Sequence, residues 1–278
     1  MFTSATSRES FLLTGVSSGI GFGLARTLLA QGHRVFGSVR SAEKAEALRT
    51  DLEGSFVPLV FDVRNEEQVA EASAILAEKL KGQHLAALVN NAGSAEIGPL
   101  LQIPIEDFRD QLDTLAVGQL TVTQQFFRHL RQTPGDARGG RVINISSVSG
   151  TRGNRFFGAY VAGKHALEGL SKTLRDEVAQ FGVRVIVVAP GNIATPIWSK
   201  QSHSVIQKYR DTPYYEALEQ TVDGLESWAV RTSMTVEEFC GALLRIVSLR
   251  NPADRYTVVK SRRPRVPFSR SRVRIIPG

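Results

Sequence analysis

TGVSSGIG, residues 14–21, joins the apolar run SFLLT (10–14) to the helical pattern FGLARTLLAQG (22–32). Gly15, Gly19 and Gly21 would supply a tight turn and let the backbone approach a ligand closely. The amides at the helix start would face a pyrophosphate, which the helix dipole favours. The spacing G-x-x-x-G-x-G differs from the common G-x-G-x-x-G, and a purely structural loop is the alternative. The strand before and the helix after favour a dinucleotide site.

The rest of the chain alternates short apolar runs with amphipathic patterns such as EEQVAEASAILAEKL (66–80). Continuously apolar runs predict a parallel sheet covered by helices on both faces. The predicted strands are 10–14, 34–39, 56–62, 85–90, 140–146, 183–189 and 255–259. We expect an α/β fold, a single doubly wound Rossmann-type domain over residues 1–260, with a central parallel sheet of about seven strands. Ligands bind such sheets beyond the carboxyl ends of the strands.

The net charge of +7 is concentrated near the end of the chain. Residues 250–278 contain nine Lys or Arg and one acidic residue, which leaves 25 basic and 26 acidic residues elsewhere. We therefore treat 261–278 as a basic C-terminal tail and expect no nucleic-acid partner. A solvated, partly disordered end is the simplest interpretation, and contact with an acidic partner or a membrane surface is a weaker one.

The sequence contains one cysteine, Cys240, which excludes an intrachain disulfide and fits a reducing compartment. The first ten residues lack the apolar core of a secretory signal, and no apolar run is long enough to span a membrane. These features predict a cytoplasmic location. The five histidines show no metal-ligand spacing, so we expect no metal site.

The end of the second predicted strand indicates which dinucleotide is bound. NAD sites usually carry Asp or Glu there, on the ribose 2′-hydroxyl. Here Val39 occupies that kind of position and Arg40 follows, so a guanidinium is available for a 2′-phosphate. Ser18 could add a hydroxyl donor. We expect NADP(H), with NAD(H) less favoured; the alternative is that Arg40 is a surface arginine without a partner.

Five motifs occur in order over about the first 200 residues. They are TGVSSGIG (14–21), NNAG (90–93), INISSVSG (143–150), YVAGK (160–164) and PGNIATP (190–196). In this set the chain resembles the classical short-chain dehydrogenase/reductase family, and most of all its steroid and retinol dehydrogenase-like members. The resemblance implies an oxidoreductase that interconverts a ketone or aldehyde and an alcohol on an apolar substrate. It also implies a homodimer or homotetramer.

The resemblance assigns roles to single residues. Tyr160 matches the catalytic acid/base, Lys164 the lysine that assists it and holds the nicotinamide ribose, and Ser147 the serine that binds the substrate oxygen. Asp62 and Val63 match the pair around the adenine, and Ile193 and Thr195 match residues near the carboxamide. With the glycine turn and Arg40, the expected cofactor contacts are Gly15, Ser17, Ser18, Gly19, Ile20, Gly21, Arg40, Asp62, Val63, Asn90, Ala92, Gly93, Tyr160, Lys164, Pro190, Gly191, Ile193 and Thr195.

The Tyr160–Lys164 pair also makes chemical sense from spacing alone. Residues i and i+4 share a helix face, so phenol and ammonium can converge. A nearby ammonium favours the phenolate, so we expect the pKa of Tyr160 to fall from its usual value of about 10. The alternative is a surface tyrosine beside a solvated lysine. Gly158 and Gly163 weaken this helix and indicate close approach by a cofactor or another helix.

One position departs from the family. A pattern like D-x-N-x-x-G is usual, and here QLDTLAVG (111–118) keeps Asp113 and Gly118 but places Leu115 where the asparagine belongs. In the family that asparagine supports a helix kink and a water that links the lysine to solvent. A leucine side chain cannot form hydrogen bonds, so we expect reduced turnover. The alternative function is a dinucleotide-binding protein that has lost or repurposed its redox activity.

Substrate specificity is expected from a loop-rich segment at about 192–230 and from the residues before the catalytic helix. Aromatic residues concentrate there, which suits either an apolar, ring-bearing substrate or the packing of a lid. They are Phe156, Phe157, Trp198, Tyr209, Tyr214, Tyr215 and Trp228.

Overall fold

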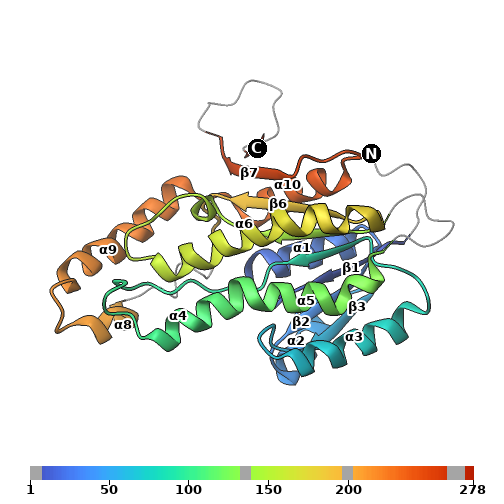
Figure 1. Ribbon diagram of the computed structural model, residues 1–278, viewed down its shortest axis with the longest axis horizontal. Coiled ribbons are helices and arrows are strands. Elements are labelled where there is room, and N and C mark those ends of the chain that lie inside the picture. Colours follow the sequence, from blue (N-terminus) through green and yellow to red (C-terminus); the bar gives the residue numbers. More distant parts are fainter. Residues whose placement is uncertain (1–7, 132–138, 196–202, 262–272) are drawn as a thin grey trace.

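The computed structural model describes residues 8–131, 139–195, 203–261 and 273–278, and these form one α/β unit around an eight-stranded sheet (Figure 1). The strand order is β3-β2-β1-β4-β5-β6-β7-β8. Strands β1 to β7 pair in parallel, and β8 pairs with β7 in antiparallel orientation. The strands are β1 (Ser10–Leu13), β2 (Arg34–Val39), β3 (Phe56–Val60), β4 (Ala87–Asn90), β5 (Arg141–Ile145), β6 (Arg184–Pro190), β7 (Arg255–Lys260) and β8 (Val273–Pro277).

Helices cover both faces of the sheet. On one face α1 (Gly19–Ala30), α2 (Ala42–Asp51) and α10 (Val236–Ser248) share an apolar core with alternate strand residues. On the other face the core is formed with α3 (Glu66–Leu80), α5 (Gly118–Phe126) and α6 (Gly158–Val178). Strand residues alternate between the two cores, as in Phe11 and Leu13 against Leu12. The expected doubly wound α/β architecture is confirmed.

Each of the seven expected strand runs overlaps one of β1 to β7, with ends that differ by at most two residues. The eighth strand was not expected, because it lies in the segment assigned to a basic tail. Val273 and Ile275 alternate with arginine and pack on the α1–α2–α10 core, so the segment buries one face despite its charge. The interpretation of a partly disordered end is wrong for 273–277, and β8 protects the edge of β7.

The smaller elements gather at the carboxyl edge of the parallel strands. They include α4 (Ile105–Leu112), the π-helical turn η1 (Asp113–Val117) and the 3₁₀ turn η3 (Val148–Gly150). Residues 203–232, here named the cap segment, contain α8 (His203–Ile206), η5 (Gln207–Tyr209) and α9 (Tyr215–Thr232). The remaining 3₁₀ turns are η2 (Phe127–His129) and η4 (Ala179–Phe181). Figure 1 shows α4, α8 and α9 together beyond the end of β6.

None of the helices in the described parts of the chain is long and apolar enough to cross a membrane.

Candidate active site

A cavity of about 1110 Å³ opens at the carboxyl edge of the sheet, where the strand order reverses between β1 and β4. Such a switch point is the usual ligand crevice of doubly wound sheets. The loops after β1, β2, β4, β5 and β6 all contribute to its lining. Every site residue predicted from the sequence lines this cavity except Gly21 and Asn90.

The glycine turn after β1 is built for close backbone approach. Gly15 and Gly19 have φ angles of 69° and 57°, a region that disfavours residues with a Cβ. A Cβ on Gly15 would lie 2.9 Å from the Cα of Ala92, and one on Gly21 would overlap the carbonyl oxygen of Gly15. Gly21 therefore supports the turn from behind the cavity wall.

Side chains that the sequence analysis missed fix this turn. The hydroxyl of Thr14 accepts hydrogen bonds from the backbone amides of Asn91 and Ala92, both at 2.9 Å. The Asn91 side chain donates to the carbonyl oxygens of Thr14 and Gly15 at 2.9 and 3.2 Å. The backbone amide of Gly15 donates to the Ser38 hydroxyl at 3.0 Å.

Asn90 has a different position from the one expected. It is 1% exposed, and its amide donates to Thr123 at 2.9 Å and to Asn144 at 2.8 Å. Asn91, the first residue beyond β4, faces the cavity instead. The sequence did contain a usable signal, because residues directly after a parallel strand reach the crevice.

Arg40 and Asp62 occupy one end of the cavity. Asp62 is bound by Arg64, with its two carboxylate oxygens accepting from Nε at 3.1 Å and Nη2 at 2.9 Å. The Arg64 hydrogen bond lowers the pKa of Asp62, and the positive charge of Arg40 adds to the effect. Arg40 itself is exposed at the cavity rim and belongs to no ion pair within the described residues. A cation is therefore available where the sequence predicts a 2′-phosphate.

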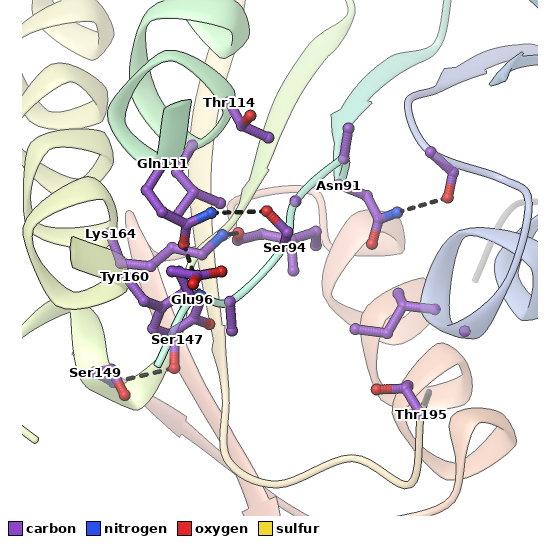
Figure 2. Close-up of a pocket in the computed structure, with 18 of the residues that line it drawn as sticks. Asn91, Ser94, Glu96, Gln111, Thr114, Ser147, Ser149, Tyr160, Lys164 and Thr195 are labelled. Carbon is purple, nitrogen blue, oxygen red and sulfur yellow. Dashed lines mark hydrogen bonds between the residues drawn. The ribbon is translucent and has the colours of Figure 1, made fainter. Parts of the chain in front are cut away.

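Tyr160 and Lys164 lie one turn apart on α6 and face the middle of the cavity, beside Ser147 (Figure 2). They are only 8% and 6% exposed. The Lys164 Nζ lies 5.8 Å from the centre of the Tyr160 ring and donates a hydrogen bond to the carbonyl oxygen of Ile145 at 2.7 Å. The surface-pair alternative is wrong, because both side chains are buried.

The expected direction of the Tyr160 shift is wrong for the chain by itself. Burial raises the pKa of Tyr160, and the hydrogen bond with Ser147 acts in the opposite direction without prevailing. Burial also lowers the pKa of Lys164 to about 8, against the opposing charge of Glu168. Spacing predicted the convergence of the two groups, but it could not reveal the desolvation of both.

A polar cluster lies behind Lys164. Glu168, one further turn along α6, accepts hydrogen bonds from the Ser146 hydroxyl at 2.7 Å and from Arg255 of β7 at 3.0 Å. The guanidinium of Arg255 also donates to Thr257 at 2.8 Å. These bonds pair the Glu168 carboxylate with a cation and tie α6 to β7 and to the residue that follows β5.

The small residues of α6 make room for neighbouring segments of this chain. A Cβ on Gly163 would lie 2.9 Å from the Cβ of Leu115, and one on Gly158 would overlap the side chain of Leu100. Leu115 is fully buried in η1, where it packs with Tyr160 and Ala95. The π-helical turn therefore lies where the family has its kink, with a leucine beside the tyrosine.

The aromatic residues that the sequence predicted for the substrate end of the cavity mostly pack into a small apolar core. Phe156, Phe157 and Tyr209 are buried together with Ile97, Ile206 and Leu218, and Tyr214 and Tyr215 pack on this cluster. Among the predicted aromatics in the described residues, only Phe157 lines the cavity. Trp198 lies outside the described residues, and so does the side chain of Trp228.

Polar residues that the sequence analysis did not identify line this end of the cavity. The Gln111 side chain donates to Ser94 at 2.7 Å and accepts from the backbone amide of Glu96 at 3.1 Å, near Tyr160 and Lys164 in Figure 2. The others include Asp107, Ser149, Arg152, Asn154, Arg155 and Asn192. They come from segments far apart in the chain, which no local motif brings together.

Comparison with known proteins identifies the family of this chain. A sequence model of the short chain dehydrogenase family matches residues 9–205. The chain is 35% identical over 250 residues to an NADPH-dependent 3-dehydrocapnine reductase from Ornithobacterium rhinotracheale, covering 89% of this chain and 87% of that protein. It is 37% identical over 190 residues to human retinol dehydrogenase 16, covering 68% of this chain and 58% of that protein.

A solved structure agrees with these sequence matches. A short chain dehydrogenase from Burkholderia cenocepacia in complex with NADP aligns with a TM-score of 0.67 at 26% identity, covering 90% of this chain and 88% of that one. The resemblance seen in the five motifs is confirmed. This chain belongs to the short chain dehydrogenase family.

Proposed function

We propose that the protein is an NADP(H)-dependent oxidoreductase that interconverts a ketone or aldehyde and an alcohol on a largely apolar substrate. The observation that carries the proposal is the convergence of Ser147, Tyr160 and Lys164 with the glycine turn on one cavity. At about 1110 Å³ this cavity exceeds the usual 300–1,000 Å³ of a single ligand site, so a dinucleotide and a substrate fit together.

The residues present fit a dinucleotide. The turn disfavours side chains, because Gly15 and Gly19 both have positive φ and a Cβ on Gly15 would meet Ala92, and this suits a backbone cradle for phosphates at the start of α1. Arg40 would pair with a 2′-phosphate, and Lys164 would hold the nicotinamide ribose. The NADPH dependence in the name of the Ornithobacterium relative and the NADP in the Burkholderia complex support this choice.

The bound nicotinamide would supply or accept the hydride. Tyr160 would donate the proton to the carbonyl oxygen, because its phenol is buried beside that position and is protonated at neutral pH. Ser147 would hold the same oxygen by a hydrogen bond. Lys164 would stabilise the phenolate left after proton transfer, since its Nζ lies on the same side of α6.

The decisive test is Tyr160→Phe, assayed by NADPH oxidation against a panel of ketones. Removing the proton donor should lower kcat by about 10²–10⁴-fold, while the Kd for NADPH stays close to that of the wild type. Equal turnover by wild type and variant would refute the role of Tyr160.

The choice of cofactor is tested by Arg40→Ala. Losing a charge-assisted contact with the 2′-phosphate should raise the KM for NADPH about 10-fold and leave the KM for NADH unchanged. Arg49→Ala, an exposed arginine on α2, is the matched control. A wild-type preference for NADH would contradict the assignment.

A second candidate function is dinucleotide binding without redox turnover, and Leu115 beside Tyr160 is the observation that favours it. Leu115→Asn separates the two. For an enzyme with a weakened proton relay we expect kcat to rise, even though the buried polar group lowers the free energy of unfolding by about 1–3 kcal/mol. NADPH binding without turnover in both proteins, across the whole panel, would favour the binding function.

Assembly into a homodimer or homotetramer and a cytoplasmic location are also proposed. The exposed apolar side chains of Leu100, Leu101, Ile105 and Val117, between 51% and 81% accessible, support self-association. Light scattering coupled to size exclusion measures the mass directly, and a monomer at micromolar concentration would contradict the proposal. The location rests on the single cysteine.

A further inference from the structure

Among the described residues that line the cavity, every carboxylate is paired with a cation, whereas some of the arginines have no anionic partner. Four carboxylates among the described residues line it, and each already has a cationic partner. Asp62 and Asp110 both pair with Arg64, at 2.9 and 3.1 Å. Glu96 and Asp107 both pair with Lys208 of the cap segment, at 2.8 and 2.6 Å. No lining carboxylate among these is left to neutralise a further cation.

Two arginines at the substrate end have no anionic partner among the residues that the structure describes. Arg152 and Arg155 line the cavity on the loop between Ser147 and Tyr160, and neither forms an ion pair within the parts of the chain that the structure describes. Both are exposed, so neither guanidinium has been desolvated by the fold. Arg40 is the corresponding unpaired cation at the other end, where a phosphate is expected.

The loop that carries the two arginines is held in a fixed shape. The Asn154 side chain donates to the Ser149 hydroxyl at 2.6 Å, and the backbone amide of Phe157 donates to the Asn154 carbonyl at 3.1 Å. The Gly98 amide donates to the Phe156 carbonyl at 2.8 Å. Phe156 has a φ of 65°, which is strained for an aromatic residue and persists only when its surroundings enforce it.

At that strained turn the aromatic side chain of Phe156 enters the apolar core, while Arg155 lines the cavity. Phe156 is buried against the cap segment, in the cluster with Ile206 and Tyr209, while Arg155 places its guanidinium 4.6 Å from the centre of the Phe156 ring. Stacking on an aromatic face leaves the N–H groups at the guanidinium edge available, which is the geometry that binds oxyanions in bidentate fashion. Phe157 lines the cavity from the same turn, with Val205 and Leu225 of the cap segment as apolar neighbours in the lining.

We infer that the substrate combines an apolar body with an anionic oxyacid group, a carboxylate, sulfonate or phosphate, which Arg152 and Arg155 bind. The apolar body would lie against Phe157, Val205 and Leu225, and the carbonyl would face Ser147 and Tyr160. This inference rests on the proposed carbonyl chemistry for the position of the reacting end. It adds a substrate class and two specificity residues to that chemistry.

The test compares ketones that differ only in charge. Four probes are used with the full-length protein: para-acetylbenzoate, its methyl ester, para-acetylbenzenesulfonate and para-acetylphenyl phosphate. For wild type, Arg152→Gln, Arg155→Gln and the double variant, kcat/KM is measured with NADPH and probe Kd by calorimetry. The matched control is Arg49→Gln, because Arg49 is an exposed arginine on α2 that does not line the cavity.

The wild type should favour at least one anionic probe over the ester. The anion-to-ester ratio should fall about 10-fold in each single variant and about 50-fold in the double variant, as expected for lost charge-assisted hydrogen bonds. The ratio should stay at the wild-type value in Arg49→Gln, and should fall with added salt. The three anions identify which oxyacid geometry the pair prefers.

The outcomes separate the two proposals. Anion binding that is lost in the double variant, with no turnover of any probe, would support the anion subsite and contradict the redox function. Turnover with an anion-to-ester ratio near one in the wild type, or a ratio unchanged in the double variant, would overturn the anion subsite and support the redox function. Equal Kd values for anions and ester in all variants would also overturn it.

Discussion

The two ends of the cavity are built in different ways. The central element of the dinucleotide end is the turn at 14–21 with the start of α1, a contiguous stretch in which Gly15 and Gly21 have no space for a Cβ. At the substrate end the lining comes from α4, the loop 151–157 and the cap segment, and the side chains set its chemistry. The substrate end needs partners such as Lys208 and Glu96, which are separated by 112 residues in the chain.

This difference explains what each end can tolerate. A backbone cradle depends on the absence of side chains, so almost any substitution of its glycines adds an obstacle. A wall of side chains can change its chemistry by substitution while the fold remains the same. The dinucleotide end should therefore be the less tolerant one, and the substrate end the one that sets specificity.

Among the substitutions that compare the two ends of the cavity, Gly15→Ala should produce the largest effect on ligand affinity. A Cβ there meets Ala92 Cα at 2.9 Å in a strained φ, at a cost of about 1–3 kcal/mol, which corresponds to a roughly 5- to 150-fold rise in the Kd for NADPH. Gly224→Ala, which lines the substrate end with nothing within 4 Å of its Cβ, should change that Kd less than 3-fold. Fluorescence titration measures both, and equal effects would remove the distinction between the two ends.

The ionisation of Lys164, midway between the two ends, gives the next prediction. Its pKa of about 8 means that the ammonium is lost above that pH, so kcat/KM should fall about 10-fold per pH unit there. The free energy of unfolding should rise over the pH range in which kcat/KM falls. Between pH 8 and 10.5 the unfolded chain keeps a proton that the folded chain has released, so the free energy of unfolding rises with pH.

Lys164→Met provides the control for that window. The variant has no amine to titrate, so this contribution to the rise in unfolding free energy should disappear from its urea-denaturation series. An identical pH dependence of stability in wild type and variant would show that the amine is not desolvated in the folded protein.

Lys208→Met probes the substrate end alone. It removes the cation that Glu96 and Asp107 share. The two ion pairs that connect the cap segment to these residues are lost, and the cavity gains net negative charge. These pairs are partly exposed, and we expect a roughly 5-fold rise in substrate KM with an unchanged Kd for NADPH. Lys172→Met, an exposed lysine on α6, is the matched control in steady-state assays. A weakened NADPH affinity would mean that the two ends are coupled.

The last prediction compares two glycines of α6 and concerns stability, with no effect expected on ligand affinity. Gly163→Ala would place a Cβ 2.9 Å from Leu115 and should lower the free energy of unfolding by about 1–3 kcal/mol. Gly169→Ala, six residues on and exposed, has nothing within 4 Å of its Cβ and should raise it by about 0.5–1 kcal/mol. Urea denaturation measures both. A stabilised Gly163→Ala would show that the contact with Leu115 is loose.

The same contrast governs what could be predicted from the sequence. Strands β1 to β7 and the turn at 14–21 could be predicted because their signals are local: apolar runs, glycine spacing and alternation with helices. Asn91 was missed in favour of its neighbour Asn90. Which of the two side chains faces the cavity depends on the residue at which β4 ends, and the sequence does not fix that residue. Strand β8 was missed because its segment is rich in arginine, and the partial burial of Val273 and Ile275 arises only when the strand pairs with β7 and packs on the core.

At the substrate end almost nothing was predictable. Gln111, Arg152 and Arg155 resemble ordinary polar residues until the fold brings their segments to one cavity. The pKa of Tyr160 shows the same limit in another form. Helical spacing predicts that an ammonium lies near, but burial raises the pKa of Tyr160, and that burial comes from Leu115, Ala95 and the rest of the tertiary structure.

The bonds from Arg255 to Glu168 have a consequence for the order of events during synthesis. Glu168 lies on α6, whereas Arg255 opens β7, 87 residues further along the chain. On a ribosome working at about 5–20 residues per second, helix α6 therefore emerges several seconds before Arg255 does. During that interval the Glu168 carboxylate behind Lys164 lacks its arginine partner. The polar cluster behind the tyrosine and lysine is thus completed only after β7 has been made.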